Sequence, residues 1–178
     1  VFFTTRVTPT PLVRLPALAA QLDLGAVWVK DETARFGLPA FKSLGVEFAV
    51  EALRQRGDLQ GITTLVCASA GNHGRAVARA ARDTGCAARV YMAHDASPSR
   101  VAAIAGEGGV VVTVDGSYDD AVRIMQAEAA TTGWTIISDT AWPGYERIPR
   151  LIMLGYTRML DEVAEQTSGA SGASGASG

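Results

Sequence analysis

The chain has 178 residues, a formal net charge of −2, 48% hydrophobic residues and 19% charged residues. This length accommodates one domain with its own core, and the interspersed charges give no case for nucleic acid or an anionic membrane surface as a partner. No apolar run reaches the length of a membrane span and no signal peptide is visible. The sequence leaves open whether a leader peptide was removed before Val1. Cys67 and Cys86 have no ligand or disulfide spacing, so we expect reduced thiols and a cytoplasmic protein.

Short apolar, often β-branched runs alternate with helix-length segments along the chain. We expect strands at 26–30, 62–68, 88–92, 110–114 and 134–138, and helices at 15–22, 43–56, 70–84, 97–105, 117–131 and from about 149 to 165. Ser97 before Pro98 predicts a capped helix start. The alternation predicts an α/β fold, with a mainly parallel sheet in the middle of three layers.

The end of the chain repeats Ser, Gly and Ala in a three-residue unit from 167 to 178. Such a composition cannot bury enough apolar surface to order itself. We therefore expect a folded region at 1–166 and a flexible tail at 167–178.

Lys42 is one of two lysines and lies in residues 36–45 (FGLPAFKSLG), where a turn leads into a helix. The helix dipole and the apolar neighbours both disfavour an ammonium group there, so we expect a lowered Lys42 pKa. An amine of this kind can form a Schiff base with an aldehyde. From its position alone, Lys42 is more often interpreted as a solvated surface lysine, and the rest of the chain decides between the two interpretations.

Ligands of parallel sheets bind beyond the carboxyl ends of the strands, and two further motifs occupy such positions. The first is SAGNHG at 69–74, where Gly71 and Gly74 permit a tight turn and a close backbone approach. Asn72 can donate and accept hydrogen bonds, and the helix start adds positive potential, which suits a planar ligand with a phenolate oxygen and a phosphate. The alternative is an ordinary glycine-rich turn capped by Asn72, with His73 as a structural, hydrogen-bonded residue.

The other is SDTAWPGY at 138–145, the third of the three motifs in chain order, which places Asp139 after a predicted strand. A carboxylate there is a candidate acid–base residue, and the alternative is a turn carboxylate that caps Thr140 or Ala141. Trp142 and Tyr145 are interpreted as packing residues. We expect no metal site, because His94 has no ligand pattern around it.

Taken in this order and strand context, the three motifs resemble the fold-type-II pyridoxal-phosphate (PLP) enzymes, the tryptophan synthase β-like group. Residues 36–45 and 138–145, continued by ERIPRLIMLGY at 146–156, look specifically like diaminopropionate ammonia-lyase, as does the spacing from YDDA at 118–121 to Trp134. The resemblance implies that Lys42 carries the cofactor as a Schiff base and that Asn72 hydrogen-bonds the ring oxygen. It also implies that Asp139 is an acid–base residue near the substrate, and Phe41, Gly71 and His73 complete the expected cofactor site.

Two features depart from that family. Its members usually have an aspartate where this chain has Ala70, and that aspartate serves as the base for one substrate enantiomer. The motif SAGNHG is instead similar to serine/threonine dehydratases. In addition, the family's glycine-rich phosphate loop and its partner for the pyridine nitrogen lie in a second half, so the chain looks like an N-terminal half.

The resemblance therefore implies a PLP-dependent carbon–nitrogen lyase of amino-acid catabolism that acts on 2,3-diaminopropionate and releases pyruvate and ammonia, as a homodimer when full length. A serine/threonine dehydratase-like lyase is the enzymatic alternative. The non-enzymatic alternative is an inactive truncated fragment of such an enzyme.

Overall fold

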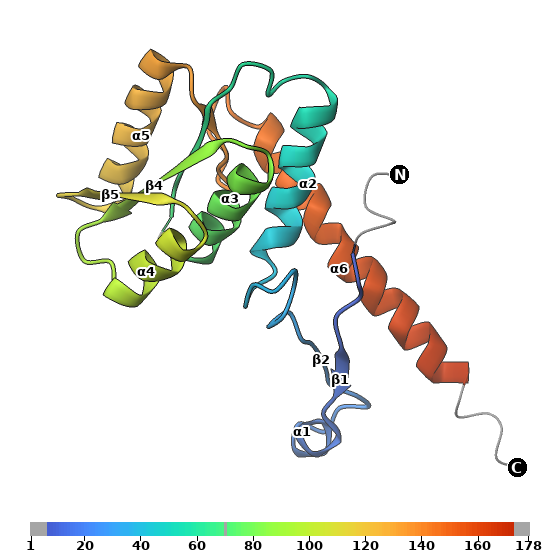
Figure 1. Cartoon of the computed structure of the whole chain (residues 1–178). Helices are drawn as coiled ribbons and strands as arrows, with labels where there is room; N and C mark the ends of the chain where they lie inside the picture. Colours follow the sequence, from blue (N-terminus) through green and yellow to red (C-terminus); the bar gives the residue numbers. More distant parts are fainter. Residues whose placement is uncertain (1–6, 70, 173–178) are drawn as a thin grey trace, which may run out of the picture.

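The computed structural model describes residues 7–69 and 71–172, and side chains as far as Ser168. Its centre is a four-stranded sheet of β3 (Thr64–Ala68), β4 (Ala87–Ala93), β5 (Val110–Val114) and β6 (Thr135–Ile136). All neighbouring strands are parallel, in the order β5-β4-β3-β6 (Figure 1). The predicted α/β fold with a mainly parallel sheet is confirmed.

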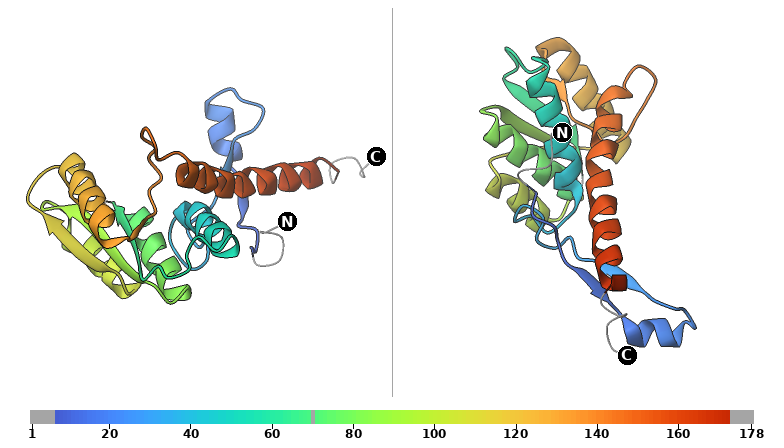
Figure 2. Two further views of the ribbon diagram at one scale, coloured as in Figure 1. Left: turned by 90° about the horizontal axis from the view of Figure 1, so that it is seen from above. Right: turned by 90° about the vertical axis from the view of Figure 1, so that its right-hand side faces the viewer.

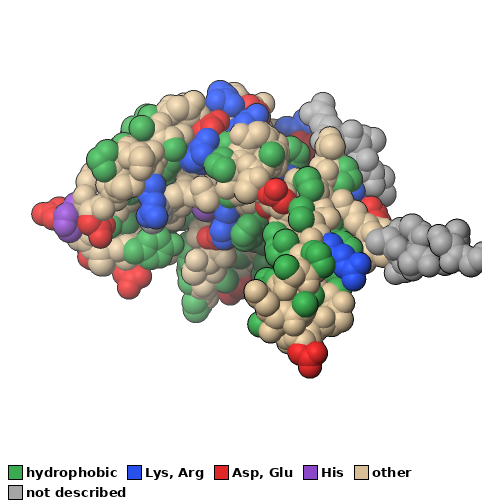
Figure 3. Space-filling model, turned by 90° about the horizontal axis from the view of Figure 1, so that it is seen from below, with side chains coloured by type: hydrophobic (Ala, Val, Ile, Leu, Met, Phe, Trp, Pro, Cys, Tyr) green, Lys and Arg blue, Asp and Glu red, His purple; other side chains and the backbone are tan. Residues whose placement is uncertain are grey.

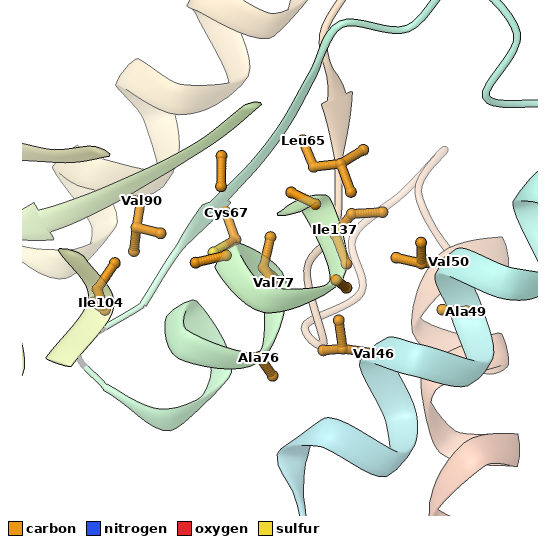
Figure 4. Close-up of a cluster of buried hydrophobic side chains, with 14 of the residues drawn as sticks. Val46, Ala49, Val50, Leu65, Cys67, Ala76, Val77, Val90, Ile104 and Ile137 are labelled. Carbon is orange, nitrogen blue, oxygen red and sulfur yellow. The ribbon is translucent and has the colours of Figure 1, made fainter. Parts of the chain in front are cut away.

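Helices cover both faces of this sheet, because successive residues of each buried strand point to opposite sides. Leu65 and Cys67 of β3 join a core with α2 (Lys42–Gln55), α3 (Asn72–Asp83) and α4 (Pro98–Gly106), shown in Figure 4. Val66 and Ala68 face α5 (Tyr118–Thr132) instead. Asp119 and Asp120 lie in the first turn of α5, and Ser117 and Asp120 form a capping box.

A small N-terminal lobe projects from this body. It consists of β1 (Leu12–Arg14), α1 (Pro16–Gln21) and β2 (Trp28–Lys30), with β1 and β2 antiparallel. The long helix α6 (Arg147–Gly172) runs from beside α2 toward this lobe (Figure 2). Apolar side chains are exposed on the lobe (Figure 3), namely Val13, Leu18, Leu22, Leu24, Trp28 and Val29.

Helices α2 and α6 cross at a pair of glycines. A Cβ atom on Gly45 would lie 2.5 Å from Cε1 of Tyr156 and 2.8 Å from the carbonyl oxygen of Ile152. On Gly155 it would lie 2.5 Å from the carbonyl oxygen of Leu44. All three distances are shorter than real Cβ contacts, so the two backbones can approach this closely only because neither residue has a side chain.

Glu162 of α6 is fully buried and ties the lobe to the body. It accepts hydrogen bonds from Arg35 at 2.7 and 2.9 Å and from the Thr10 backbone N–H at 3.2 Å, and Lys30 Nζ lies 2.7 Å from it. Arg35, which is 1% exposed, also donates to Glu32. Burial alone would raise the Glu162 pKa, but hydrogen bonds from Arg35, Lys30 and Thr10 hold it down at about 2.

Two sequence-based expectations about helix ends are wrong. Ser97 makes no capping hydrogen bond, because its hydroxyl pairs with Ser99 at 3.1 Å. Helix α6 does not end near Glu165 but continues through Gly172. The Thr167 and Ser168 hydroxyls each donate at 2.8 Å to carbonyls one turn back, and extending a formed helix costs far less than starting one. The rest of the expected tail, residues 173–178, lies outside the described residues.

Replacing Glu162 with Ala should destabilise the chain by on the order of 3–5 kcal/mol, because Lys30 would be left buried without a carboxylate partner and Arg35 would keep only Glu32. Chemical denaturation at pH 7 measures this change. The matched control is Glu165→Ala, since Glu165 is 64% exposed and its loss should cost less than about 1 kcal/mol.

The Glu162 contribution should also depend on pH. Its folded-state pKa is lowered, so the stabilisation is present above the unfolded value of 4.5 and is lost as pH falls toward about 2. Equal losses of stability in the two variants at pH 7 would contradict this account of Glu162.

The glycine crossing predicts that Gly45→Ala lowers stability by about 1–3 kcal/mol, because the added methyl meets the Ile152 backbone as well as the Tyr156 ring. Gly25→Ala is the control, since a Cβ atom there has nothing within 4 Å. Thermal unfolding of both variants checks the prediction, and a Gly45→Ala melting point equal to that of the parent chain would refute the close crossing.

Candidate active site

A cleft of about 630 Å³ lies beyond the carboxyl ends of β3 and β6. This volume is typical of small-molecule sites in proteins. The face seen in Figure 3 is hollowed near its centre, where acidic, basic and histidine side chains meet. All the residues predicted from the sequence for the site line this cleft, namely Phe41, Lys42, Gly71, Asn72, His73 and Asp139.

Lys42 is the first residue of α2 and points its amine across the cleft. Its Nζ donates to Oδ2 of Asp139 at 2.7 Å, and the two side chains are 32% and 24% exposed. The same Nζ lies 5.4 Å from the centre of the Phe41 ring and 5.6 Å from that of Tyr156. The structure thus joins the lysine of the first motif to the carboxylate of the third.

The expected lowering of the Lys42 pKa is wrong, and the pKa is raised. Burial does lower it, as anticipated, but the hydrogen bond and charge of Asp139 and the nearby Tyr156 outweigh burial. Burial alone would raise the Asp139 pKa, but the hydrogen bond and charge of Lys42 outweigh burial, so the pKa is lowered. At neutral pH the site therefore holds an ammonium–carboxylate pair, and the amine becomes a nucleophile or base only after its proton leaves.

The other lysine is not open to the same chemistry. Lys30 Nζ donates to the Thr10 carbonyl at 2.6 Å and to Gln166 at 2.9 Å, and it is paired with Glu162. An ammonium group has three donors, and all three are used.

His73 is held by its backbone contact and also faces the ion pair. Its Nε2 is 2.8 Å from the Ile137 carbonyl oxygen, which can only accept, so Nε2 carries the hydrogen. Burial dominates in lowering its pKa and keeps the ring neutral. The buried Nδ1 then presents a lone pair, 3.6 Å from Asp139 Oδ2 and without a hydrogen-bond partner in the described part of the chain.

The turn of the SAGNHG motif is capped by Ser69, a role that the sequence did not reveal. The Ser69 hydroxyl accepts from the N–H groups of Gly71 at 3.2 Å and Gly74 at 3.0 Å. Asn72 is therefore not the cap. Its exposed side chain has no hydrogen-bond partner among the residues that the structure describes, and it is left available to a ligand. Ala70 lies outside the described residues.

The two glycines of this turn have different reasons to be glycine. A Cβ atom on Gly74 would lie 2.7 Å from Cγ1 of Val90, so Gly74 lets α3 pack directly on β4. On Gly71 a Cβ atom would have nothing within 4 Å. The Gly71 backbone thus faces open space in the cleft, where a ligand can approach it closely.

Asp139 is fixed by the turn that follows it. The Tyr145 hydroxyl donates to the Ile136 carbonyl at 2.8 Å and accepts from the Ser138 N–H at 2.9 Å, and the Tyr145 ring stacks on Trp142 at 4.1 Å. Thr140 is capped by Ser138 at 3.2 Å rather than by Asp139. Tyr145 therefore does more than pack, because it secures the backbone on which Asp139 stands.

Other features of the cleft could not be anticipated from motifs. The N-terminal lobe and the segment after it supply one wall, from Val29 to Thr33, and α5 supplies Tyr118. The described residues contain no group of three His, Cys, Asp or Glu side chains that could hold a metal ion. Cys67 is buried and Cys86 half-buried, and both are free.

Comparison with known proteins gives consistent matches. Residues 3–174 match the family described as "Pyridoxal-phosphate dependent enzyme". Diaminopropionate ammonia-lyase of Escherichia coli K12 is 39% identical over 173 residues, which cover 89% of this chain and 44% of the relative. The enzyme of that name from Salmonella typhimurium is 40% identical over 176 residues, covering 88% and 44%.

The fold is matched as well. The crystal structure of Escherichia coli diaminopropionate ammonia lyase in apo form superposes with a TM-score of 0.87 at 38% identity, covering 95% of this chain and 49% of that one. The chain thus spans about half the length of the relatives it matches. Because the family match extends over almost the whole sequence, the chain belongs to the pyridoxal-phosphate-dependent enzymes.

Proposed function

We propose that this chain supplies the amine and the acid–base groups of a PLP-dependent ammonia-lyase, which eliminates ammonia from 2,3-diaminopropionate and yields pyruvate. The observation that carries the proposal is the Lys42–Asp139 pair, 2.7 Å apart in a cleft at the carboxyl edge of a parallel sheet. The ammonia-lyase relatives, at 39–40% identity, support this choice of substrate.

The residues present suit the cofactor. Lys42 supplies an amine, and the ring of Phe41 lies 5.4 Å from its Nζ. The Gly71 backbone faces open space in the cleft. Among the described residues, neither the exposed Asn72 amide nor the buried Nδ1 of His73 has a hydrogen-bond partner. We assign cofactor binding to these five residues. The cofactor, when bound, supplies an electrophilic carbon for the amine and an electron sink for the substrate.

Lys42 and Asp139 of this chain then transfer the protons of the reaction. The Lys42 ammonium must first pass a proton to a neighbour, and Asp139 Oδ2 is the group it contacts. Once neutral, Nζ of Lys42 can remove the substrate α-proton. Asp139, now protonated, can return its proton to the β-amino group as it leaves. Lys42 and Asp139 are therefore the catalytic residues of this proposal.

A serine/threonine dehydratase-like lyase is the second candidate, and Ala70 within SAGNHG is the feature that favours it. The two candidates differ in the leaving group, an amine or a hydroxyl at the β-carbon. Comparing pyruvate release from 2,3-diaminopropionate and from serine separates them. An inactive fragment is the non-enzymatic alternative, and failure of PLP to attach to Lys42 would favour it.

We also propose that the protein acts in the cytoplasm, in amino-acid catabolism, as a homodimer when full length. The two free thiols support a reducing compartment. Exposed apolar residues on α6, Met153, Leu154 and Leu160, offer surface for a partner subunit. Across residues 7–69 and 71–172, no helix is both long and apolar enough to cross a membrane.

Treatment of the chain with PLP and then borohydride should attach the cofactor to Lys42 and not to Lys30, because all three Lys30 donors are occupied. Peptide mass spectrometry distinguishes the two sites. Lys42→Ala should abolish the attachment and leave the circular dichroism spectrum unchanged. Attachment at Lys30 instead would refute the assignment of Lys42.

For a protein that contains this chain together with the remaining length of its relatives, we predict a preference for one enantiomer of 2,3-diaminopropionate by about a hundredfold or more. The reason is that the methyl group of Ala70 cannot accept a proton, which leaves Lys42 and Asp139 as the bases. A pyruvate-release assay on each enantiomer measures the ratio. Ala70→Asp should increase turnover of the disfavoured enantiomer, and equal turnover by the unmodified enzyme would contradict the prediction.

A further inference from the structure

Tyr156 of α6 lies close to the Lys42 amine, although it is not one of the residues that line the cleft. Its ring centre is 5.6 Å from Nζ, and it meets the Phe41 ring edge-to-face at 5.1 Å and 70°. The amine thus lies over two aromatic rings while it contacts the carboxylate of Asp139. Aromatic faces attract cations and exclude water from them.

The hydroxyl of Tyr156 is buried, and it has no hydrogen-bond partner of good geometry within the described residues. Leaving such a group unsatisfied is costly, so an orphaned hydroxyl beside a reacting amine calls for an explanation. The glycine crossing supplies the placement, since the Tyr156 ring occupies the space that a side chain on Gly45 would fill. The close crossing therefore leaves room for the Tyr156 ring beside the start of α2.

We propose that Tyr156 is a positioning residue for Lys42, whose ring and hydroxyl hold the ε-amino group beside Asp139 and govern the release of its proton. The inference rests on the proposed function in one respect, that Lys42 is the reacting amine.

The electrostatics of the site are consistent with this role. Burial and the Asp139 charge outweigh the Lys42 charge and raise the Tyr156 pKa, so the phenol is neutral and can accept a hydrogen bond from an ammonium group. Burial lowers the Lys42 pKa, and Asp139 and then Tyr156 raise it by more. The other titratable groups near the amine are Asp139 and His73, and Tyr118 lines the same cleft.

The test uses the cofactor-free chain, so that a negative result for Tyr156 is distinct from a failure of PLP to attach to Lys42. Lys42 and Lys30 are the only lysines in the sequence, and peptide mass spectrometry can follow acetylation of each amine across a range of pH. Acetylation requires the neutral amine. Tyr156→Phe keeps the ring and removes the hydroxyl that stabilises the ammonium form of Lys42. A larger fraction of Lys42 should then be neutral, so its acetylation rate at neutral pH should rise on the order of threefold to tenfold. The acetylation rate of Lys30 should not change.

The matched control is Tyr91→Phe, which also removes a buried tyrosine's hydroxyl, one bonded to Glu128 at 2.6 Å in the core against α5. It should leave the Lys42 rate at the parent value. A folded Tyr156→Phe variant with the parent Lys42 rate would overturn the proposal, as would equal acceleration in both variants.

If the Tyr156→Phe variant does not fold, a measurement on the unmodified chain tests the proposal instead. Nuclear Overhauser contacts between the Lys42 ε-protons and the Tyr156 ring should be observed in lysine-labelled protein. Their absence, with Lys42 contacts to other groups present, would also overturn the proposal.

Discussion

The contact between Lys42 Nζ and Asp139 Oδ2 joins the start of α2 to the turn after β6, across 97 residues of sequence. Neither motif has a defined chemistry without the other. A lone lysine at a helix start is disfavoured as a cation, and a lone half-buried carboxylate is disfavoured as an anion. Together they stabilise each other as a charged pair, which gives the cleft a proton held at one known position. The sheet makes this possible by bringing the ends of separate strands to the same edge.

Helix α6 holds both sides of this site in place. Near its start it crosses α2 at Gly45 and Gly155, which positions α2 and therefore Lys42. Two turns further on, Glu162 binds Arg35 and Lys30, which belong to the lobe and segment that form the opposite wall of the cleft. One helix thus sets the width of the cleft, although no predicted site residue lies on it. A buried charge cluster of this kind is weak evidence for stability in general, but breaking it leaves unpaired charges, so it enforces a single arrangement.

The layered fold and the positions of the three motifs could be predicted from the sequence, because both depend on local patterns. The β-branched run at β3 and the glycines of SAGNHG each specify their own conformation, and strand ends in parallel sheets meet at one edge. The resemblance to PLP enzymes rested on the same motifs, and the family match over residues 3–174 confirms it.

What sequence could not supply was the effect of distant partners. The sign of the Lys42 pKa shift depends on Asp139, and the burial of Glu162 depends on Arg35, 127 residues away. No local pattern marks Tyr145 or Tyr156 as more than packing residues, because their hydroxyls act on backbone or amine groups from other segments. The helical continuation of α6 was missed for a related reason, since composition alone does not show that a preceding helix can be extended.

One atom, the Nζ of Lys42, is the proposed point of attachment for the cofactor. A crystal structure of the chain grown with PLP tests this assignment. We expect electron density continuous from Lys42 Nζ into the cleft, with the ring beside Asn72 and Asp139 within reach of the reacting carbon. Density for PLP joined to Lys30, or lying outside this cleft with Lys42 still paired to Asp139, would contradict it.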